Sequence, residues 1–194
     1  MREKDDPIEL FRTWLDEARK AKIKEPTAMA LATADTKGQP SVRMVLLKDF
    51  GEEGFVFYTN RESKKGDELE KNRKAALCFY WMQTNKQVRV SGIVEQVSDR
   101  EADAYFATRP RLAQIGAWAS QQSRPMKGRF DLEKKAAFYT AKFGAKKVPR
   151  PSYWVGYRVV PEQIEFWTQK PFRLHERILF TKQSAGWRVS RLFP

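Results

Sequence analysis

The chain has 194 residues and a formal net charge of +13, from 37 lysines and arginines against 24 aspartates and glutamates. One cysteine, Cys78, and one histidine, His175, argue against an internal disulfide, a clustered metal site and a conventional catalytic triad. The charge indicates an anionic partner, and nucleic acid, an anionic membrane or a phosphorylated small molecule would all fit. Redox chemistry would need an organic cofactor, because the side chains offer none.

The N-terminal sequence does not look like a secretion signal. The segment MREKDDPIELF is charged where a signal peptide has its apolar core, and no apolar run approaches membrane-spanning length. Cys78 lies in the apolar run 75–81, where a buried thiol behaves as a small hydrophobe. We therefore expect a cytoplasmic protein.

The first third of the chain predicts one helix and an antiparallel meander. Asp6 followed by Pro7 is typical of a helix start, and apolar residues recur at helical spacing through Ala18. Alternating patterns then predict strands at residues 29–33, 41–48 and 55–59.

The rest of the chain mixes helices and strands. Helices are expected at 64–72, from the capping box at Ser98 through Phe106, and at 132–143, before Gly144. Strands are expected at 75–81, 87–97, 157–160, 163–168, 173–181 and 187–192, with a hairpin turn at 184–186.

Many short strands with interposed helices favour a closed or split antiparallel barrel decorated by helices over a parallel nucleotide-binding sheet. We expect a mainly β (α+β) single domain over 1–194. Its parts would be an N-terminal helical segment at 1–25, a helical insertion at 98–143 and C-terminal strands at 153–194.

Two cations sit in or beside an apolar strand. Arg43 lies inside the expected strand 41–48 and Lys48 lies at its end. Burying an arginine is costly without an anion, so a bound anionic ligand is one explanation. Their odd separation puts the two side chains on opposite strand faces, and a cation that reaches out to the barrel rim explains the pattern equally well.

The segment 172–177 gives a stronger pattern. In a strand, Arg173, His175 and Arg177 would share one face while Leu174 faces the other way. Neighbouring cations repel unless an anion or an aromatic ring lies over them. A lone histidine is often structural, but the two flanking arginines favour a ligand-binding face here.

Two further stretches could contact a ligand. Tyr105, Arg109 and Arg111 lie around a helix end, and the polar run 121–125 offers amide and hydroxyl groups to a phosphate or a heterocycle. Trp167 could pack against a flat cofactor, although most tryptophans belong to the core.

Several motifs, in order along the chain, resemble the pyridoxine/pyridoxamine 5′-phosphate oxidase family. They are Arg43-Met44-Val45-Leu46-Leu47-Lys48, Phe57-Tyr58-Thr59-Asn60, Gln87-Val88-Arg89-Val90, Tyr105-Phe106 through Arg109-Pro110-Arg111, Gln114-Ile115-Gly116-Ala117-Trp118-Ala119-Ser120 and Arg173-Leu174-His175.

The resemblance implies an FMN-binding split-barrel homodimer with its sites at the subunit interface. The expected FMN-binding residues are Arg43, Met44, Val45, Leu46, Leu47, Lys48, Tyr58, Thr59, Lys64, Lys65, Gln87, Gln122, Ser123, Trp167 and Arg177. The expected substrate-binding residues are Lys48, Tyr105, Arg109, Arg173, Leu174 and His175, of which Arg173 and His175 would be catalytic.

By the same resemblance, the substrates are pyridoxamine 5′-phosphate and pyridoxine 5′-phosphate, and the product is pyridoxal 5′-phosphate. A hydride would pass from substrate C4′ to flavin N5, and O2 would reoxidise the flavin to give H2O2. No metal and no side-chain nucleophile is implied.

The chain departs from the family pattern at several positions. Ala113 replaces a usual serine in the expected substrate phosphate site, and Lys64 replaces a common arginine. Thr168-Gln169 and Glu176 also differ, and the segment that precedes Asp6 in the family is expected to be mostly missing.

Two other functions remain open at this point. A related split-barrel flavoprotein could act on a different ring system, which Ala113 would favour. The charge of +13 could instead mark a nucleic-acid-binding barrel, although the informative arginines lie on apolar strands and not in an exposed stripe.

Overall fold

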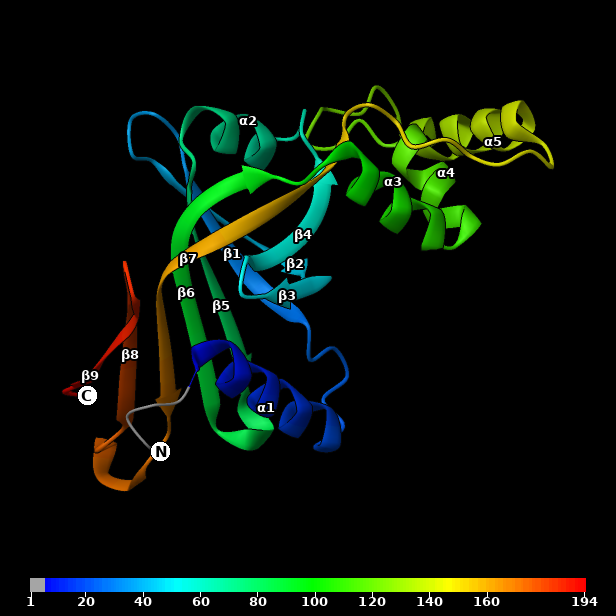
Figure 1. Ribbon diagram of the computed structural model, residues 1–194. Helices are drawn as coiled ribbons and strands as arrows, with labels where there is room; N and C mark the ends of the chain where they lie inside the picture. The colour runs from blue at the N-terminus through cyan, green and yellow to red at the C-terminus, as the bar shows by residue number, and fades with distance from the viewer. Residues whose placement is uncertain (1–5) are drawn as a thin grey trace.

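The computed structural model describes residues 6–194 as one antiparallel sheet with helices at its ends (Figure 1). The strand order is β2-β1-β5-β6-β7-β4-β3, with β8 paired to β7 and β9 to β8. The strands are β1 (Ala28–Ala34), β2 (Pro40–Leu46), β3 (Asp49–Gly51), β4 (Gly54–Asn60), β5 (Lys74–Trp81), β6 (Lys86–Gln96), β7 (Trp154–Thr168), β8 (Glu176–Gln183) and β9 (Gly186–Leu192). The sheet curves into a half-barrel, which confirms the expected split-barrel fold.

Alternating side chains of the strands and one helix face make the core. Helix α1 (Pro7–Lys20) is capped by Asp6, whose carboxylate accepts a hydrogen bond from the Ile8 backbone amide, as expected. Phe11 of α1 makes edge contacts with Phe50, Phe55 and Phe79. Because aromatic pairs favour edge-to-face contact, this cluster fixes α1 against the half-barrel.

The remaining helices lie around the other end of the sheet. They are α2 (Lys64–Lys71), α3 (Asp99–Thr108), α4 (Arg111–Ala119) and α5 (Asp131–Phe143). Ser98 caps α3 by accepting from the Glu101 amide, as its capping box predicts. Helix α4 was not predicted as a separate element within the helical insertion. Among residues 6–194, no helix has the length and apolarity to cross a bilayer.

Strand β7 corrects the prediction of two separate strands at 157–160 and 163–168. It runs for 15 residues and includes Pro161. The pairing register with β6 shifts there, opposite Ser91 and Gly92. Proline is tolerated at such a bulge. A Cβ on Gly92 would lie 1.9 Å from the Val160 carbonyl oxygen, so only glycine allows the strands to pair there.

The predicted strand 173–181 is wrong at its start, because β8 begins at Glu176. Residues Pro171–Arg173 form a 3-10 turn, closed by a hydrogen bond from the Leu174 amide to the Pro171 carbonyl. Phe172 and Arg173 have φ of 57° and 62°. Such left-handed backbone cannot continue a strand, so Arg173 and His175 do not alternate with Arg177 along a regular strand.

The predicted strand 41–48 is also shorter than expected, since β2 ends at Leu46. Leu47 turns inward to the core and Lys48 pairs its amide with the Val56 carbonyl at the start of the next hairpin. Arg43 and Lys48 are therefore not two positions of one regular strand.

Candidate functional site

A cleft of about 580 Å³ opens between β2, β4 and α2. Its lining, which defines the β2–β4 cleft, is Arg43, Met44, Val45, Leu46, Lys48, Tyr58, Thr59, Lys64, Lys65, Gln122 and Ser123. All of these residues were expected to bind the cofactor. The volume falls within the range of small-molecule sites, at about 300 to 1,000 Å³.

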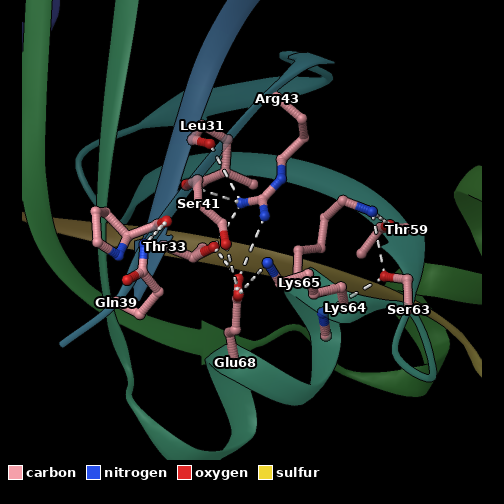
Figure 2. Close-up of polar contacts among 12 residues, drawn as sticks. Leu31, Thr33, Gln39, Ser41, Arg43, Thr59, Ser63, Lys64, Lys65 and Glu68 are labelled. Atoms are coloured by element: carbon pink, nitrogen blue, oxygen red, sulfur yellow. Dashed lines mark hydrogen bonds and ion pairs between the residues drawn. The ribbon is translucent and has the colours of Figure 1, made fainter. Parts of the chain in front are cut away.

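Lys65 is a buried ammonium at the α2 end of the cleft, and its side chain points toward β4 (Figure 2). Its Nζ donates to Thr59 Oγ1 at 3.0 Å, Ser63 Oγ at 3.2 Å and Gln122 Oε1 at 3.4 Å. Burial, and then the nearby Arg43, lower the pKa of Lys65 to about 8, while Glu68 opposes this shift. A buried cation held only by neutral oxygens is well suited to an anionic ligand.

Arg43 has an internal anion that the sequence analysis did not anticipate. Its guanidinium donates to Glu68 Oε2 at 3.2 Å and to Thr33 Oγ1 at 2.5 Å (Figure 2). Burial would raise the pKa of Glu68, but hydrogen bonds from Thr33, Ser41 and Arg43 outweigh it and hold the pKa below its usual value. Glu68 therefore offers a third explanation for the charge of Arg43, beside a bound anion and a position at the barrel rim, and the contact of Arg43 with the cofactor stays a prediction.

A second hollow, of about 380 Å³, adjoins the cleft and is named here the Arg109 pocket. It shares part of its lining with the cleft. Its lining residues are Tyr58, Thr59, Asn60, Arg109, Ala113, Gly116, Ala117, Ser120, Gln122 and Trp154.

Arg109 is the cation of this pocket. Its guanidinium lies 4.9 Å from the ring of Trp154, and its Nη1 is buried without a hydrogen-bond partner in the described part of the chain. Burial lowers the pKa of Arg109. Tyr105 stacks on Tyr58 at 4.3 Å beside it. A buried donor without a partner is rare, and an oxyanion in the pocket would satisfy it.

Arg111 points away from this site. Its guanidinium donates to the backbone carbonyls of Gly144 and Lys146, so it joins α4 to the loop after α5.

The other expected site residues form a separate group on β6, β7 and β8. Gln87 pairs with Trp167, and Trp167 pairs with Arg177, across three neighbouring strands. The His175 ring lies 4.7 Å from Trp167, and its Nδ1 accepts a hydrogen bond from the Lys170 amide at 3.2 Å. We call these residues, with Arg173 and Leu174, the β6–β8 group.

Arg177 also has an internal carboxylate that was not anticipated. It donates through Nε to Glu165 Oε1 at 2.9 Å, and Arg89 contacts the same carboxylate. The hydrogen bond to Glu165 raises the pKa of Arg177. As with Arg43, a carboxylate of the chain itself stabilises the expected ligand-binding arginine.

Within one chain, β4, which lines the cleft, pairs with the first half of β7, and β8 pairs with its last residues (Figure 1). Thr59 of the cleft pairs with Val155, and Trp167 lies 12 residues further along the strand (167 − 155). At about 3.3 Å per residue, that separation is ~40 Å of strand. One chain therefore presents two half-sites that are far apart along its longest strand.

Comparison with known families matches nearly the whole chain. Residues 15–167 match the model described as pyridoxamine 5′-phosphate oxidase. Residues 154–194 match the pyridoxine 5′-phosphate oxidase C-terminal dimerisation region. The second range contains β7, β8 and β9, so the dimerisation region carries most of the β6–β8 group.

The alignments with two curated relatives span nearly the full length of this chain and of each relative. The pyridoxine/pyridoxamine 5′-phosphate oxidase of Brucella canis is 57% identical over 191 residues, which are 97% of this chain and 94% of that protein. The protein of the same name from Chelativorans sp. (strain BNC1) is 56% identical over 193 residues, 99% of this chain and 92% of that protein.

Two solved structures are also similar. PhzG from Burkholderia lata 383, in complex with tetrahydrophenazine-1-carboxylic acid, is 33% identical with a TM-score of 0.92, covering 97% of this chain and 93% of that chain. A pyridoxamine 5′-phosphate oxidase-related, FMN-binding protein from Nostoc punctiforme PCC 73102 shares the fold at 17% identity and a TM-score of 0.75, covering 95% and 97%.

Together, the half-barrel, the cation-lined cleft and these relatives define an oxidoreductase of the split-barrel class. The chain belongs to the pyridoxine/pyridoxamine 5′-phosphate oxidase family.

Proposed function

We propose that this protein is an FMN-dependent oxidase that converts pyridoxamine 5′-phosphate or pyridoxine 5′-phosphate to pyridoxal 5′-phosphate, with O2 as the electron acceptor and H2O2 as a product. The observation that carries the proposal is that two neighbouring pockets each contain a cation able to bind an anion. Lys65 of the cleft is buried and Arg109 of its neighbour is half-buried with a buried Nη1, and neither has a carboxylate bonded to it in the described chain. A phosphorylated cofactor beside a phosphorylated substrate needs two such positions.

The donors of the cleft fit a flavin phosphate. Lys64, Lys65 and Ser123 supply ammonium and hydroxyl groups at its polar end, and Met44, Val45 and Leu46 supply an apolar wall along β2. FMN would contribute the redox chemistry, as a two-electron acceptor that oxygen can reoxidise. The chain would hold its phosphate and keep its ring in register with the substrate.

The substrate phosphate would bind in the Arg109 pocket. Arg109 donates through its buried Nη1, Lys48 adds charge from the adjoining cleft, and Tyr105 is kept in place by its stack on Tyr58. Burial raises the pKa of Tyr58 to about 12, so its hydroxyl stays neutral at physiological pH. These residues orient the substrate and do not act as nucleophiles.

The β6–β8 group would complete each site from the second subunit of a homodimer. Gln87, Trp167 and Arg177 would contact the cofactor, and Arg173 and His175 would contact the reacting end of the substrate. His175 accepts at Nδ1 from the Lys170 amide, so its neutral ring carries the proton on Nε2 and presents a donor. Arg173 would lie over the substrate ring and hold it in position against the flavin.

The test is a reconstitution with air as the oxidant. Purified protein should take up FMN and show the visible flavin absorbance, and adding pyridoxamine 5′-phosphate should then produce pyridoxal 5′-phosphate absorbance and H2O2. A preparation that binds no FMN contradicts the cofactor assignment. Bound FMN without product contradicts the substrate assignment alone.

One observation favours a second candidate, oxidation of a partly reduced carboxylated ring. Ala113 gives the Arg109 pocket a methyl group and no hydroxyl, and a carboxylate needs fewer donors than a phosphate. The similar PhzG structure holds tetrahydrophenazine-1-carboxylic acid. Turnover of such a ring by the FMN-loaded protein, with no turnover of either vitamin B6 phosphate, would favour this candidate.

A further inference from the structure

Glu68 is a buried carboxylate directly behind the cationic end of the β2–β4 cleft (Figure 2). Its side chain is 4% exposed and does not line the cleft. Thr33 Oγ1 donates to it at 2.5 Å and Ser41 Oγ at 2.7 Å, and Arg43 Nη2 donates at 3.2 Å. Lys64 Nζ lies 3.7 Å from its second oxygen. The carboxylate is therefore fully engaged by the chain and has no free edge for a ligand.

The charges at this end of the cleft do not balance by themselves. Arg43, Lys64 and Lys65 contribute three positive charges, and Glu68 contributes one negative charge, which leaves +2 (3 − 1). A phosphate monoester carries about −1.5 to −2 at pH 7. The remainder therefore matches one phosphate group.

Removing Glu68 would leave three cations within one small region and would strip Arg43 of its only carboxylate in the described chain. Breaking a buried ion pair from one side is strongly unfavourable because the other charge stays behind. An anion in the cleft could compensate for that loss, whereas a carboxylate on the protein surface could not.

We propose that Glu68 is an internal counter-ion. It neutralises one of the three positive charges at this end of the cleft while no ligand is bound, so that the charge that remains matches a single phosphate monoester. Glu68 is thus a positioning and charge-setting residue and makes no contact with the ligand. The inference rests on the proposed function only for the identity of the phosphate ligand.

The experiment compares E68Q with E70Q in the FMN-free protein. Glutamine at 68 keeps an acceptor for Arg43 and Thr33 but removes the charge. Glu70 is on the same helix and exposed, so E70Q changes the net charge equally without touching the network. Urea unfolding is followed with and without inorganic phosphate, at constant ionic strength.

We expect E68Q to lower the urea midpoint by about 1 M and E70Q to leave it nearly unchanged. Phosphate should raise the midpoint of E68Q more than that of the wild type, because the anion replaces the lost charge. A wild-type-like midpoint for E68Q, or an equal or smaller response to phosphate, would overturn the proposal.

A double variant keeps the test decisive if E68Q does not fold. Adding R43Q removes the cation that E68Q leaves unpaired, so the double variant should be more stable than E68Q alone, as a coupled pair requires. A double variant no more stable than E68Q would show that Glu68 acts through hydrogen bonding alone.

Titration with FMN and riboflavin separates this inference from the proposed function. If Glu68 only sets charge, E68Q should bind FMN at least as tightly as the wild type and bind riboflavin equally. FMN binding weakened by about tenfold or more, with riboflavin unchanged, would mean that Glu68 is needed to place Arg43 for the ligand, and the counter-ion role would be wrong. A wild type that binds phosphate but not FMN would refute the cofactor assignment and leave the counter-ion intact.

Discussion

The two half-sites of this chain differ in how completely the chain itself builds them. In the β2–β4 cleft, paired strands and α2 hold the charged side chains, and Lys65 is only 7% exposed. In the turn that carries Arg173 and Leu174 of the β6–β8 group, Leu174 is 69% exposed and its neighbour Phe172 is 92% exposed, on backbone with positive φ at Phe172 and Arg173. The cleft holds Lys65 buried within the chain, whereas the turn before β8 presents Arg173 and Leu174 outward.

The proposed sharing of each site between two subunits would account for this difference. A buried lysine that the chain already holds in place can bind a phosphate without further ordering, which lowers the entropic cost of binding. An exposed aromatic and apolar turn is the kind of surface that association buries. Because Trp167, Arg173, His175 and Arg177 all lie within the dimerisation region 154–194, dimerisation and completion of the site would be one event.

Mixed dimers give the sharpest test of that division. Lys65→Gln should disable the cleft and Arg173→Ala the β6–β8 group, so each homodimer should be nearly inactive. When the two are unfolded and refolded together, a mixed dimer has one doubly altered site and one intact site. Random pairing should then restore about a quarter of wild-type activity.

Arg173→Ala homodimers should still bind FMN and remain yellow, since Arg173 is expected to contact only the substrate. Refolding each variant alone is the control. No recovery in the mixture, with dimers confirmed by light scattering, would place both half-sites of one active site in the same subunit.

The sequence carried enough information for most of the fold. Period-two patterns and capping residues located most strands and helices to within a few residues, though not β3 or α4, because these signals act between near neighbours. The errors occurred where contacts between residues distant in sequence decide the local structure. Pro161 suggested a break between two strands, but the bulge opposite Gly92 keeps β7 continuous.

The candidate site was predicted only in part. The arginines Arg43 and Arg177 were recognised as unusual in apolar strands, but their partners Glu68 and Glu165 were not. The four-residue spacing of Lys64 and Glu68 on one helix face was the available signal for Glu68. Its contact with Arg43 crosses 25 residues of sequence, so only the tertiary structure could reveal it.

The pH dependence of cofactor binding tests the role of buried Lys65 in the β2–β4 cleft, separately from the exposed turn of the β6–β8 group. The pKa of Lys65 is about 8 in the folded chain, below its value of about 10.4 in an unfolded chain. Above pH 8 the ammonium deprotonates, so FMN affinity should fall by up to about tenfold per pH unit. In the same window the unfolded chain binds more protons, so the FMN-free protein should become more stable as pH rises, up to about pH 10.

Fluorescence quenching titrations between pH 7 and 10 would measure this effect, with riboflavin as the ligand that lacks the phosphate. Lys65→Arg keeps its charge throughout and should flatten the profile. A wild-type affinity for FMN that is constant from pH 7 to 10 would contradict a role for Lys65 in phosphate binding.

The smallest expected effect concerns the Arg109 pocket, which adjoins the preorganised cleft but lacks one donor. Ala113→Ser places a hydroxyl where the methyl group now lines the pocket. A hydroxyl that donates to a bound phosphate should lower KM for pyridoxamine 5′-phosphate by about three- to tenfold, from about 1 kcal/mol of net hydrogen-bond energy. Ala107→Ser, on the exposed face of α3, is the matched control and should leave KM unchanged.

If Ala113→Ser also leaves KM unchanged while Arg109→Gln raises it, the phosphate reaches Arg109 without approaching α4. If Ala113→Ser raises KM for the phosphorylated substrate, the methyl group itself contacts the ligand, and the pocket is adapted to a less polar anion than phosphate.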